Sequence, residues 1–291
     1  MAPDLVIAAG PHVEWHAHPD VWVLMIGGTL AYVWAVMYLG PKHVSPGEET
    51  ATRKQKLCFL LGMAFLWIGS DTPIHDVAED YLFSFHMVQH MLFTLVAPPL
   101  LLMGMPRWLL RLLTKPAPVA RLLRALTRPI VALLLFNLVV AVTHWPTLVN
   151  LSVRSEAAHF GLHVVIVSTA LIMWWPVVDP LPGFGRLSEP GKMLYLFGQS
   201  ILPTVPASFL TFANSPIYSS YAEFPRLWGV SAVSDQMVAG LIMKILGGLL
   251  LWVVIAVIFF RWYAKEDRDQ DEPVSWEDFE QDLRVWDLRR T

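Results

Sequence analysis

The chain has 291 residues, of which 55% are hydrophobic and 15% charged, and its formal net charge is −3. A soluble domain usually carries about 25% charged residues, and the apolar residues here fall in long blocks, which excludes a soluble enzyme, a disordered protein and a protein with one membrane anchor. A single cysteine, Cys58, excludes an internal disulfide and an iron–sulfur cluster, and no basic stripe indicates nucleic acid.

We predict an all-α fold, a polytopic membrane helix bundle with seven transmembrane helices. A helix needs roughly 20 apolar residues to cross the hydrocarbon core. We expect no cleavable signal peptide, because the N-terminus lacks a basic leader followed by an apolar run. In the sixth span, Pro203 and Pro206 predict a kink. The predicted spans are 21–39, 57–72, 84–105, 129–144, 157–178, 193–213 and 237–262.

The distribution of lysine and arginine predicts the orientation of these spans. If the N-terminus is outside, 18 of the 21 basic residues lie in cytoplasmic loops or the C-terminal tail. Only Arg154 and Arg226 then lie outside, and Lys244 lies within the seventh span. We therefore predict an outer N-terminal arm (1–20), a seven-helix transmembrane domain (21–262) and a charged cytoplasmic tail (263–291), in the plasma membrane of a bacterium.

Nine of the ten histidines fall on the outer side of the predicted topology, the exception being His43. Ionisable groups are costly in hydrocarbon and usually face the interior of the bundle. His86 and His90 in the third span are four residues apart, as are His159 and His163 in the fifth, so each pair shares one helix face. Two such pairs at one depth predict an intramembrane metal site, whereas a single pair would more simply indicate packing.

Copper is the metal that the neighbouring residues favour. Met87 and Met91 directly follow the histidines of the third span, and imidazole with thioether suits copper, Cu(I) in particular. The lack of thiolates argues against a structural zinc site. Direct coordination by these methionines and simple gap filling in an apolar helix both stay open.

Further polar residues flank the histidine pairs. His144 ends the fourth span, and Asp71 and His75 follow the second. Asp235 opens the seventh span, where a helix N-cap and a ligand role are equally open. Lys244 lies too deep to reach the inner surface easily, and its cost of about 2.5–3.5 kcal/mol indicates a paired or functional role. The remaining candidates of this span are Gln236 and Met237.

The N-terminal arm carries a second group of possible ligands. Its members, within seven residues, are His12, Glu14, His16 and His18. They could capture a metal ion in water and pass it to the membrane site. A solvated polar arm is the simpler interpretation.

Three blocks of the sequence carry a resemblance to a known family. They are FSFHMVQHMLFTLVAPPLLLMGMP (83–106), THWPTLVNLSVRSEAAHFGLHVVIVSTALIMWWPVVDPLP (143–182) and the shorter SDQMVAGLIMK (234–244). With its predicted seven-span layout, the chain resembles the multi-spanning CtaG family of cytochrome c oxidase assembly factors. The positions of the family's motifs are occupied by His86, His90, His144, His159, His163, Asp235 and Gln236. The family usually has tryptophan where Lys244 stands, so no role for Lys244 carries over.

The resemblance implies a bacterial plasma-membrane protein that helps to mature a haem–copper oxidase through copper. Its partners would be cytochrome c oxidase subunits or another copper carrier, and its function would be non-enzymatic. Two alternatives stay open, a bis-histidine haem protein and an intramembrane zinc hydrolase with three histidines and an aspartate. Known seven-span hydrolases of that kind run N-in, opposite to the orientation predicted here.

Overall fold

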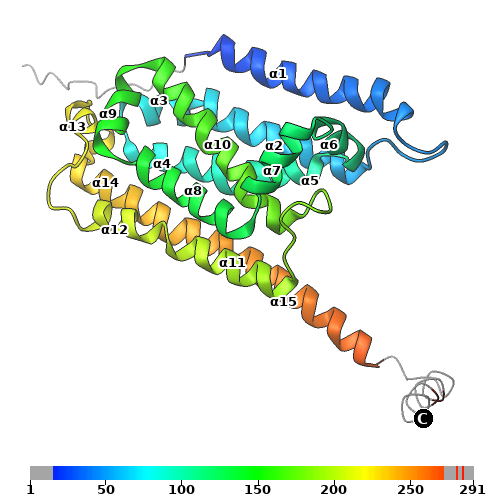
Figure 1. Ribbon diagram of the computed structural model, residues 1–291. Coiled ribbons are helices and arrows are strands. Elements are labelled where there is room, and N and C mark those ends of the chain that lie inside the picture. Colours follow the sequence, from blue (N-terminus) through cyan, green and yellow to red (C-terminus); the bar gives the residue numbers. More distant parts are fainter. Residues whose placement is uncertain (1–15, 272–279, 281–283, 285–291) are drawn as a thin grey trace, which may run out of the picture.

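The computed structural model describes residues 16–271 together with residues 280 and 284, and within them it is helical without a β-strand. His12, Glu14 and most of the predicted charged tail lie outside the described residues. Figure 1 shows a bundle of roughly parallel and antiparallel helices, with α1 along one edge and the end of α15 projecting away from the bundle. The longer helical stretches are α1 (Pro19–Trp34) with η1 (Ala35–Leu39), α2 (Arg53–Asp71), α4 (Phe83–Met91) with η3 (Leu92–Val96) and α5 (Ala97–Gly104), α8 (Pro129–Thr143), α10 (Glu156–Val178), α11 (Glu189–Ile201) with α12 (Thr204–Phe212), and α14 (Ala232–Leu241) with η5 (Ile242–Leu246) and α15 (Gly247–Asp271).

Short helices join these long ones at the two ends of the bundle. Several have a proline in the first turn, where its missing N–H has no helical partner. The short elements are η2 (Gly40–Lys42), α3 (Pro73–Asp80), α6 (Arg107–Leu113), α7 (Ala117–Leu126), α9 (Pro146–Arg154), α13 (Ser219–Glu223) and η4 (Leu227–Gly229).

Among the described residues, five helical stretches are long and apolar enough to cross a membrane, or up to seven if each of two bent pairs forms one span. Two of the predicted spans, 57–72 and 129–144, are shorter than the roughly 20 residues needed to cross the membrane, and the bent pairs account for this. Helix α2 meets α3 at a bend of 43°, and the 15-residue α8 follows α7 at a bend of 78°. The chain is therefore an all-helical membrane protein whose second and fourth predicted runs lie on these bent pairs.

Irregular turns interrupt four of the long stretches. The sixth predicted span breaks between α11 and α12, where Pro203 is the N-cap residue of α12, so the predicted kink lies at this proline. Single π-helical turns lie within the first, third and seventh predicted spans, at η1, η3 and η5. A π turn adds one residue to a helix and often marks a functional site. Two of these turns adjoin or contain methionines that line the same cavity, Met91 before η3 and Met243 within η5.

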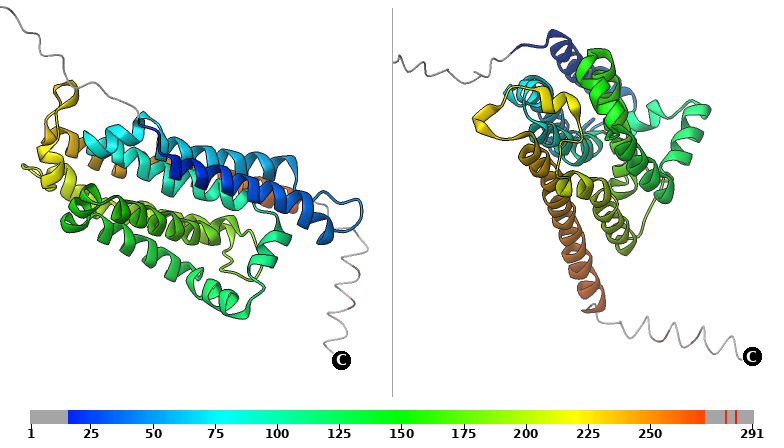
Figure 2. Two further views of the ribbon diagram at one scale, coloured as in Figure 1. Left: turned by 90° about the horizontal axis from the view of Figure 1, so that it is seen from above. Right: turned by 90° about the vertical axis from the view of Figure 1, so that its left-hand side faces the viewer.

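Helices α2 and α5 approach each other closely at two glycines, Gly62 and Gly104. A Cβ at Gly104 would lie 2.5 Å from the backbone nitrogen of Phe59, and a Cβ at Gly62 would lie 2.8 Å from the side chain of Leu101. These glycines allow the two backbones to approach and hold α5, with its preceding segment α4, against α2. Figure 2 shows the bundle from above and from one end.

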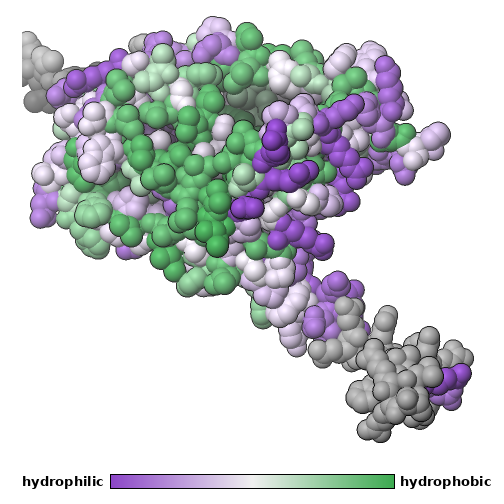
Figure 3. Space-filling view, viewed as in Figure 1, coloured by the Kyte–Doolittle hydropathy of each residue, from purple (hydrophilic) through white to green (hydrophobic). Residues whose placement is uncertain are grey.

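The two ends of the bundle differ in chemistry. Helices α3, α9 and α13 lie at one end, and α6 and α7 lie at the other (Figure 1). The second end carries the basic side chains of Arg107, Arg111, Arg121 and Arg124. Figure 3 shows apolar side chains gathered over the middle of one face, with more polar residues toward both ends, as expected for a bundle surrounded by lipid.

Candidate metal centre

A continuous series of histidine rings lies at the end of the bundle opposite to the basic helices. Neighbouring rings along the series have centroids between 4.2 and 5.8 Å apart for the pairs His18–His75, His75–His159, His159–His163, His86–His90 and His90–His144. The rings of His86 and His163 join the two halves at 6.0 Å. The series draws its rings from the start of α1, from α3, α4 and α10, and from the C-cap of α8. His43 lies apart from it and stacks on Trp108.

Three rings of this series form the deepest group, which we call the buried triad: His86, His90 and His163. One ligand nitrogen from each lies within 4.8 Å of the others. His86 and His90 point from one face of α4, and His163 faces them from α10. A small cavity of about 20 Å³ lies among the triad and His159. Two helices therefore present imidazoles to a common point, as the two i, i+4 pairs require.

Several ring nitrogens at this point are buried without a hydrogen-bond partner among the described residues, namely His86 Nδ1, His163 Nε2 and His144 Nε2. A buried polar atom without a partner costs free energy. His144 Nδ1 lies 2.7 Å from the carbonyl oxygen of Val140, which can only accept, so Nδ1 carries the proton and Nε2 keeps its lone pair. A backbone carbonyl that orients one nitrogen while the other faces a cavity is the usual arrangement of a metal-binding histidine.

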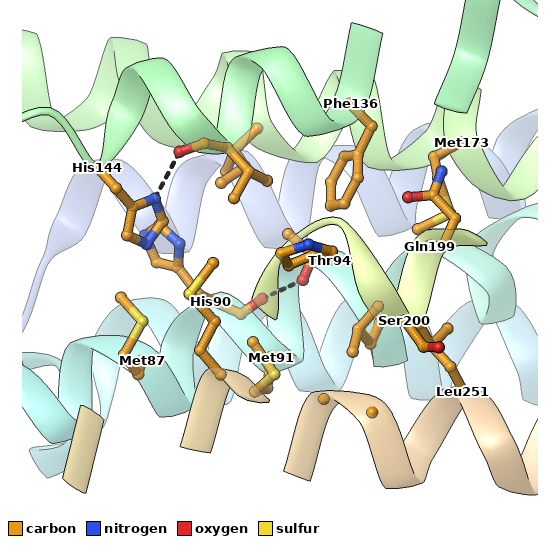
Figure 4. A pocket seen from close by; sticks show the side chains of 17 residues that line it. Met87, His90, Met91, Thr94, Phe136, His144, Met173, Gln199, Ser200 and Leu251 are labelled. Carbon is orange, nitrogen blue, oxygen red and sulfur yellow. Dashed lines mark hydrogen bonds between the residues drawn. The ribbon is translucent and has the colours of Figure 1, made fainter. Parts of the chain in front are cut away.

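The predicted methionines line a cavity that also touches His90, one member of the buried triad. Met87 and Met91 line a second cavity of about 50 Å³, together with Met173 and Met243 and the rings of His90 and His144. Figure 4 shows the sulfurs of Met87 and Met91 near these two rings. We call this space the methionine cavity. The thioethers are therefore neighbours of the triad rather than members of it.

A second group of possible ligands lies nearer the end of the bundle: His75, Glu79 and His159. Glu79 Oε1 lies 3.2 Å from His75 Nε2 and 2.9 Å from His159 Nε2. Glu79 was not among the predicted ligands, although its position four residues after His75 on α3 is a usable signal. This outer group lines a cavity of about 390 Å³.

Two further residues hold the outer group in place. Gln89 Nε2 donates to the carbonyl oxygen of Gly69 at 2.7 Å and lies 2.9 Å from His75 Nδ1. The phenol of Tyr221 on α13 donates to the carbonyl oxygen of Ala78 at 2.9 Å. Burial, reinforced by the nearby carboxylates of Glu79 and Asp235, raises the pKa of Tyr221 well above its ordinary value, so this phenol stays neutral.

Asp71, a predicted candidate, binds the N-terminal segment rather than a histidine of the triad. Its carboxylate accepts from the backbone N–H of His18 at 2.7 Å and from the indole of Trp67 at 3.1 Å, and it also contacts the indole of Trp22. His18 Nδ1 lies 3.2 Å from the same carboxylate. Asp71 thereby fixes the start of α1 over α2 and brings His18 beside His75.

Asp235 has a capping role in the structure, but for a different helix from the expected one. Its carboxylate accepts from the backbone N–H groups of Phe83 at 2.7 Å and Ser84 at 3.0 Å, so it caps α4. The N-cap of its own helix, α14, is Ser231. A carboxylate at a helix N-terminus is favourable because unpaired N–H groups and the helix dipole meet it there. Both carboxylate oxygens are thus engaged away from the histidine rings.

The remaining candidates of the seventh predicted span also lie outside the histidine groups. Gln236 accepts from the backbone N–H of Ile217 at 2.7 Å and so anchors the loop after α12. Met237 is 42% exposed and faces outward. The ammonium of Lys244 lies 5.6 Å from the ring centroid of Phe212, a cation–π contact that gives this residue a partner.

Comparison with known proteins places this arrangement in a family. The uncharacterized proteins Mb0105 of Mycobacterium bovis and MT0111 of Mycobacterium tuberculosis are each 25% identical in an alignment of 235 residues that covers 73% of this chain. The chain spans only 34% of the length of these two relatives. No solved structure matches. The model of the cytochrome c oxidase caa3 assembly factors (Caa3_CtaG) matches residues 30–265, and the chain therefore belongs to this CtaG family.

Proposed function

We propose that the protein is a non-enzymatic assembly factor that binds copper at the buried triad and helps to deliver it to cytochrome c oxidase. The observation that carries this proposal is the convergence of three buried imidazoles from α4 and α10, with ligand nitrogens within 4.8 Å of one another. Unpaired nitrogens at His86 and His163 give a bound ion its lone pairs. A cation there would remove the cost of leaving these atoms unsatisfied.

We further infer seven spans in a bacterial plasma membrane, with the histidine end outside and the C-terminus in the cytoplasm. The basic side chains on α6 and α7 lie at the end opposite to the rings. Lysine and arginine are enriched in cytoplasmic loops. This orientation supports delivery on the outer side of the membrane.

The methionine cavity supports copper over other metals. Thioether is a soft donor that Cu(I) prefers and imidazole also suits copper, whereas structural zinc sites are built mainly from thiolates, with or without histidine. His90 is shared, since it belongs to the triad and also lines the methionine cavity. A soft ion therefore has thioether sulfur beside it on one side and imidazole on the other.

The cavity among the rings of the triad favours an ion over a haem at that place. It measures about 20 Å³ and is lined by packed side chains, whereas a porphyrin needs several times that space between its axial ligands. The predicted hydrolase site needs an aspartate beside three histidines, and Asp235 is instead engaged with the N-terminus of α4. Both observations support a bound ion at the triad.

Oxidase maturation in cells tests the proposed function. In a strain that lacks the natural gene, we expect the double variant His86→Ala/His163→Ala to yield an oxidase with at most a tenth of its normal copper content. His43→Ala is the matched control, because it removes an imidazole from the other end of the bundle, and it should restore full content. A fully metallated oxidase in the double variant would refute delivery through the triad.

A further inference from the structure

A further cavity that touches the histidine series lies outside the small cavity of the buried triad. It measures about 390 Å³, and its lining includes His18, His75, Glu79, Glu156, His159 and His163. We call it the vestibule. His159 and His163 also line the small cavity of the triad, so the two spaces share a wall made of imidazoles.

We propose that His75, Glu79 and His159 form a second copper site, which receives the ion in the vestibule before it reaches the buried triad. This inference rests on the proposed function, since it supplies the route by which copper arrives there. The class of ligand is a first-row metal ion, held by two imidazole nitrogens and one carboxylate.

The ligand atoms of the outer group are spaced almost as they would be around a bound metal ion. Metal–nitrogen and metal–oxygen bonds are about 2.0–2.2 Å long, so two ligand atoms of one ion lie about 3–4 Å apart. Glu79 Oε1 is 3.2 Å from His75 Nε2 and 2.9 Å from His159 Nε2, and all three atoms lie within 4.8 Å. Small movements of these side chains would bring the atoms around an ion.

Gln89 determines which nitrogen of His75 carries the proton in the empty site. The carbonyl of Gly69 can only accept, so the Gln89 group beside it is the NH2 end, which also meets His75 Nδ1. His75 Nδ1 therefore accepts, and its Nε2 carries the proton toward Glu79. A neutral imidazole binds an ion through its unprotonated nitrogen, so an ion at Nε2 requires the proton to move to Nδ1. Rotation of the Gln89 amide then lets its Oε1, which has no hydrogen-bond partner among the described residues, accept from Nδ1–H. Gln89 has no exposed surface and holds the ring from behind.

Transfer to the triad is then a ligand exchange with no change in the charge of the ion. The ring of His159 lies 4.2 Å from that of His163 and 6.2 Å from that of His86. A bond to His163 forms as the bond to Glu79 breaks. The bonds to His75 and His159 then break as the ion binds His86 and His90, which leaves the outer group free for a second ion. Movement inward exchanges the carboxylate for imidazoles, which suit copper better.

The test uses the purified full chain, loaded from a coloured Cu(I)–bathocuproine complex under reducing conditions. The wild type should bind two copper ions per chain. Glu79→Gln keeps the size of the side chain but removes its charge, and should leave one ion per chain and slow loading at least tenfold. Glu156→Gln is the matched control, because Glu156 lines the same vestibule outside the outer group, and it should load within twofold of the wild type.

The outcomes separate this inference from the proposed function. A Glu79→Gln protein that elutes and melts like the wild type, yet binds two ions at the normal rate, would overturn the outer site while leaving the triad intact. Equal slowing by Glu79→Gln and Glu156→Gln would also overturn it, since only the charge of the vestibule would matter. Unchanged copper content in His86→Ala/His163→Ala would instead reject the triad.

Discussion

The rings of His90 and His144 meet edge to face, with centroids 5.2 Å apart, and both line the methionine cavity. His90 comes from the last turn of α4 and His144 from the C-cap of α8. The C-terminal end of α8 and the histidine-bearing face of α4 thus bring two imidazole rings into contact. An ion at His90 has access to donors of both kinds.

The methionine cavity should contribute to copper affinity. Replacing Met91 and Met243 together by leucine conserves volume, so we expect the fold to lose less than about 1.5 kcal/mol for each. If their sulfurs bind the ion, Cu(I) affinity should fall about tenfold in a competition titration. Met237→Leu, at an exposed position, should have no effect. Equal affinity in the double variant and in this control would show that the thioethers only fill space.

Asp235 should stabilise the fold without binding metal. Asp235→Ala removes two hydrogen bonds from a carboxylate to the buried N-terminus of α4, each worth about 1.5–3 kcal/mol. We expect a lower unfolding temperature in detergent and an unchanged copper content in the folded fraction. Ser231→Ala, which removes the cap of α14 itself, should cost about 1 kcal/mol. Loss of copper from folded Asp235→Ala protein would mean that this carboxylate is a ligand after all.

The close approach of α2 and α5 should depend on Gly104. A Cβ there would lie 2.5 Å from the backbone nitrogen of Phe59, so Gly104→Ala should destabilise the protein by about 1–3 kcal/mol through overpacking. Gly27→Ala places a Cβ with nothing within 4 Å and should change stability by less than about 1 kcal/mol. Thermal unfolding of the two variants compares them directly. Similar melting temperatures would contradict the packing described here.

The orientation of the bundle can be tested with cysteine labelling, because Cys58 is the single natural cysteine and is buried. In a Cys58→Ser background, the first variant is Trp228→Cys. Trp228 lies beside Phe85 near the histidine end and is 69% exposed. Lys115→Cys lies between α6 and α7 at the basic end. In intact spheroplasts, an impermeant maleimide should label the first and spare the second. The reverse pattern would place the triad on the cytoplasmic side.

The sequence was sufficient to predict those parts of the structure that depend on local periodicity. Apolar runs predicted an all-helical membrane protein, and the resemblance in three blocks identified the family, both of which are confirmed. Pro203 predicted the break in the sixth run. The two i, i+4 histidine pairs placed four imidazoles on two helix faces, and the structure brings these faces together.

The features that the sequence did not reveal depend on contacts between distant segments. Asp235 caps a helix about 150 residues earlier in the chain, a pairing that no local pattern specifies. Met173 joins Met87 and Met91 only because α10 packs beside α4. Glu79 is an exception, because its spacing of four residues from His75 is visible in the sequence. Its contact with His159 depends on the packing of α3 against α10 and is not visible there.

The copper content of the purified protein, measured by mass spectrometry without metal-affinity chromatography, tests the central claim most directly. The His86→Ala/His163→Ala variant should hold one copper ion fewer per chain than the wild type and the His43→Ala control, with elution and melting showing that it is folded. Equal copper in all three proteins, or zinc or haem in place of copper in the wild type, would contradict a copper site at the buried triad.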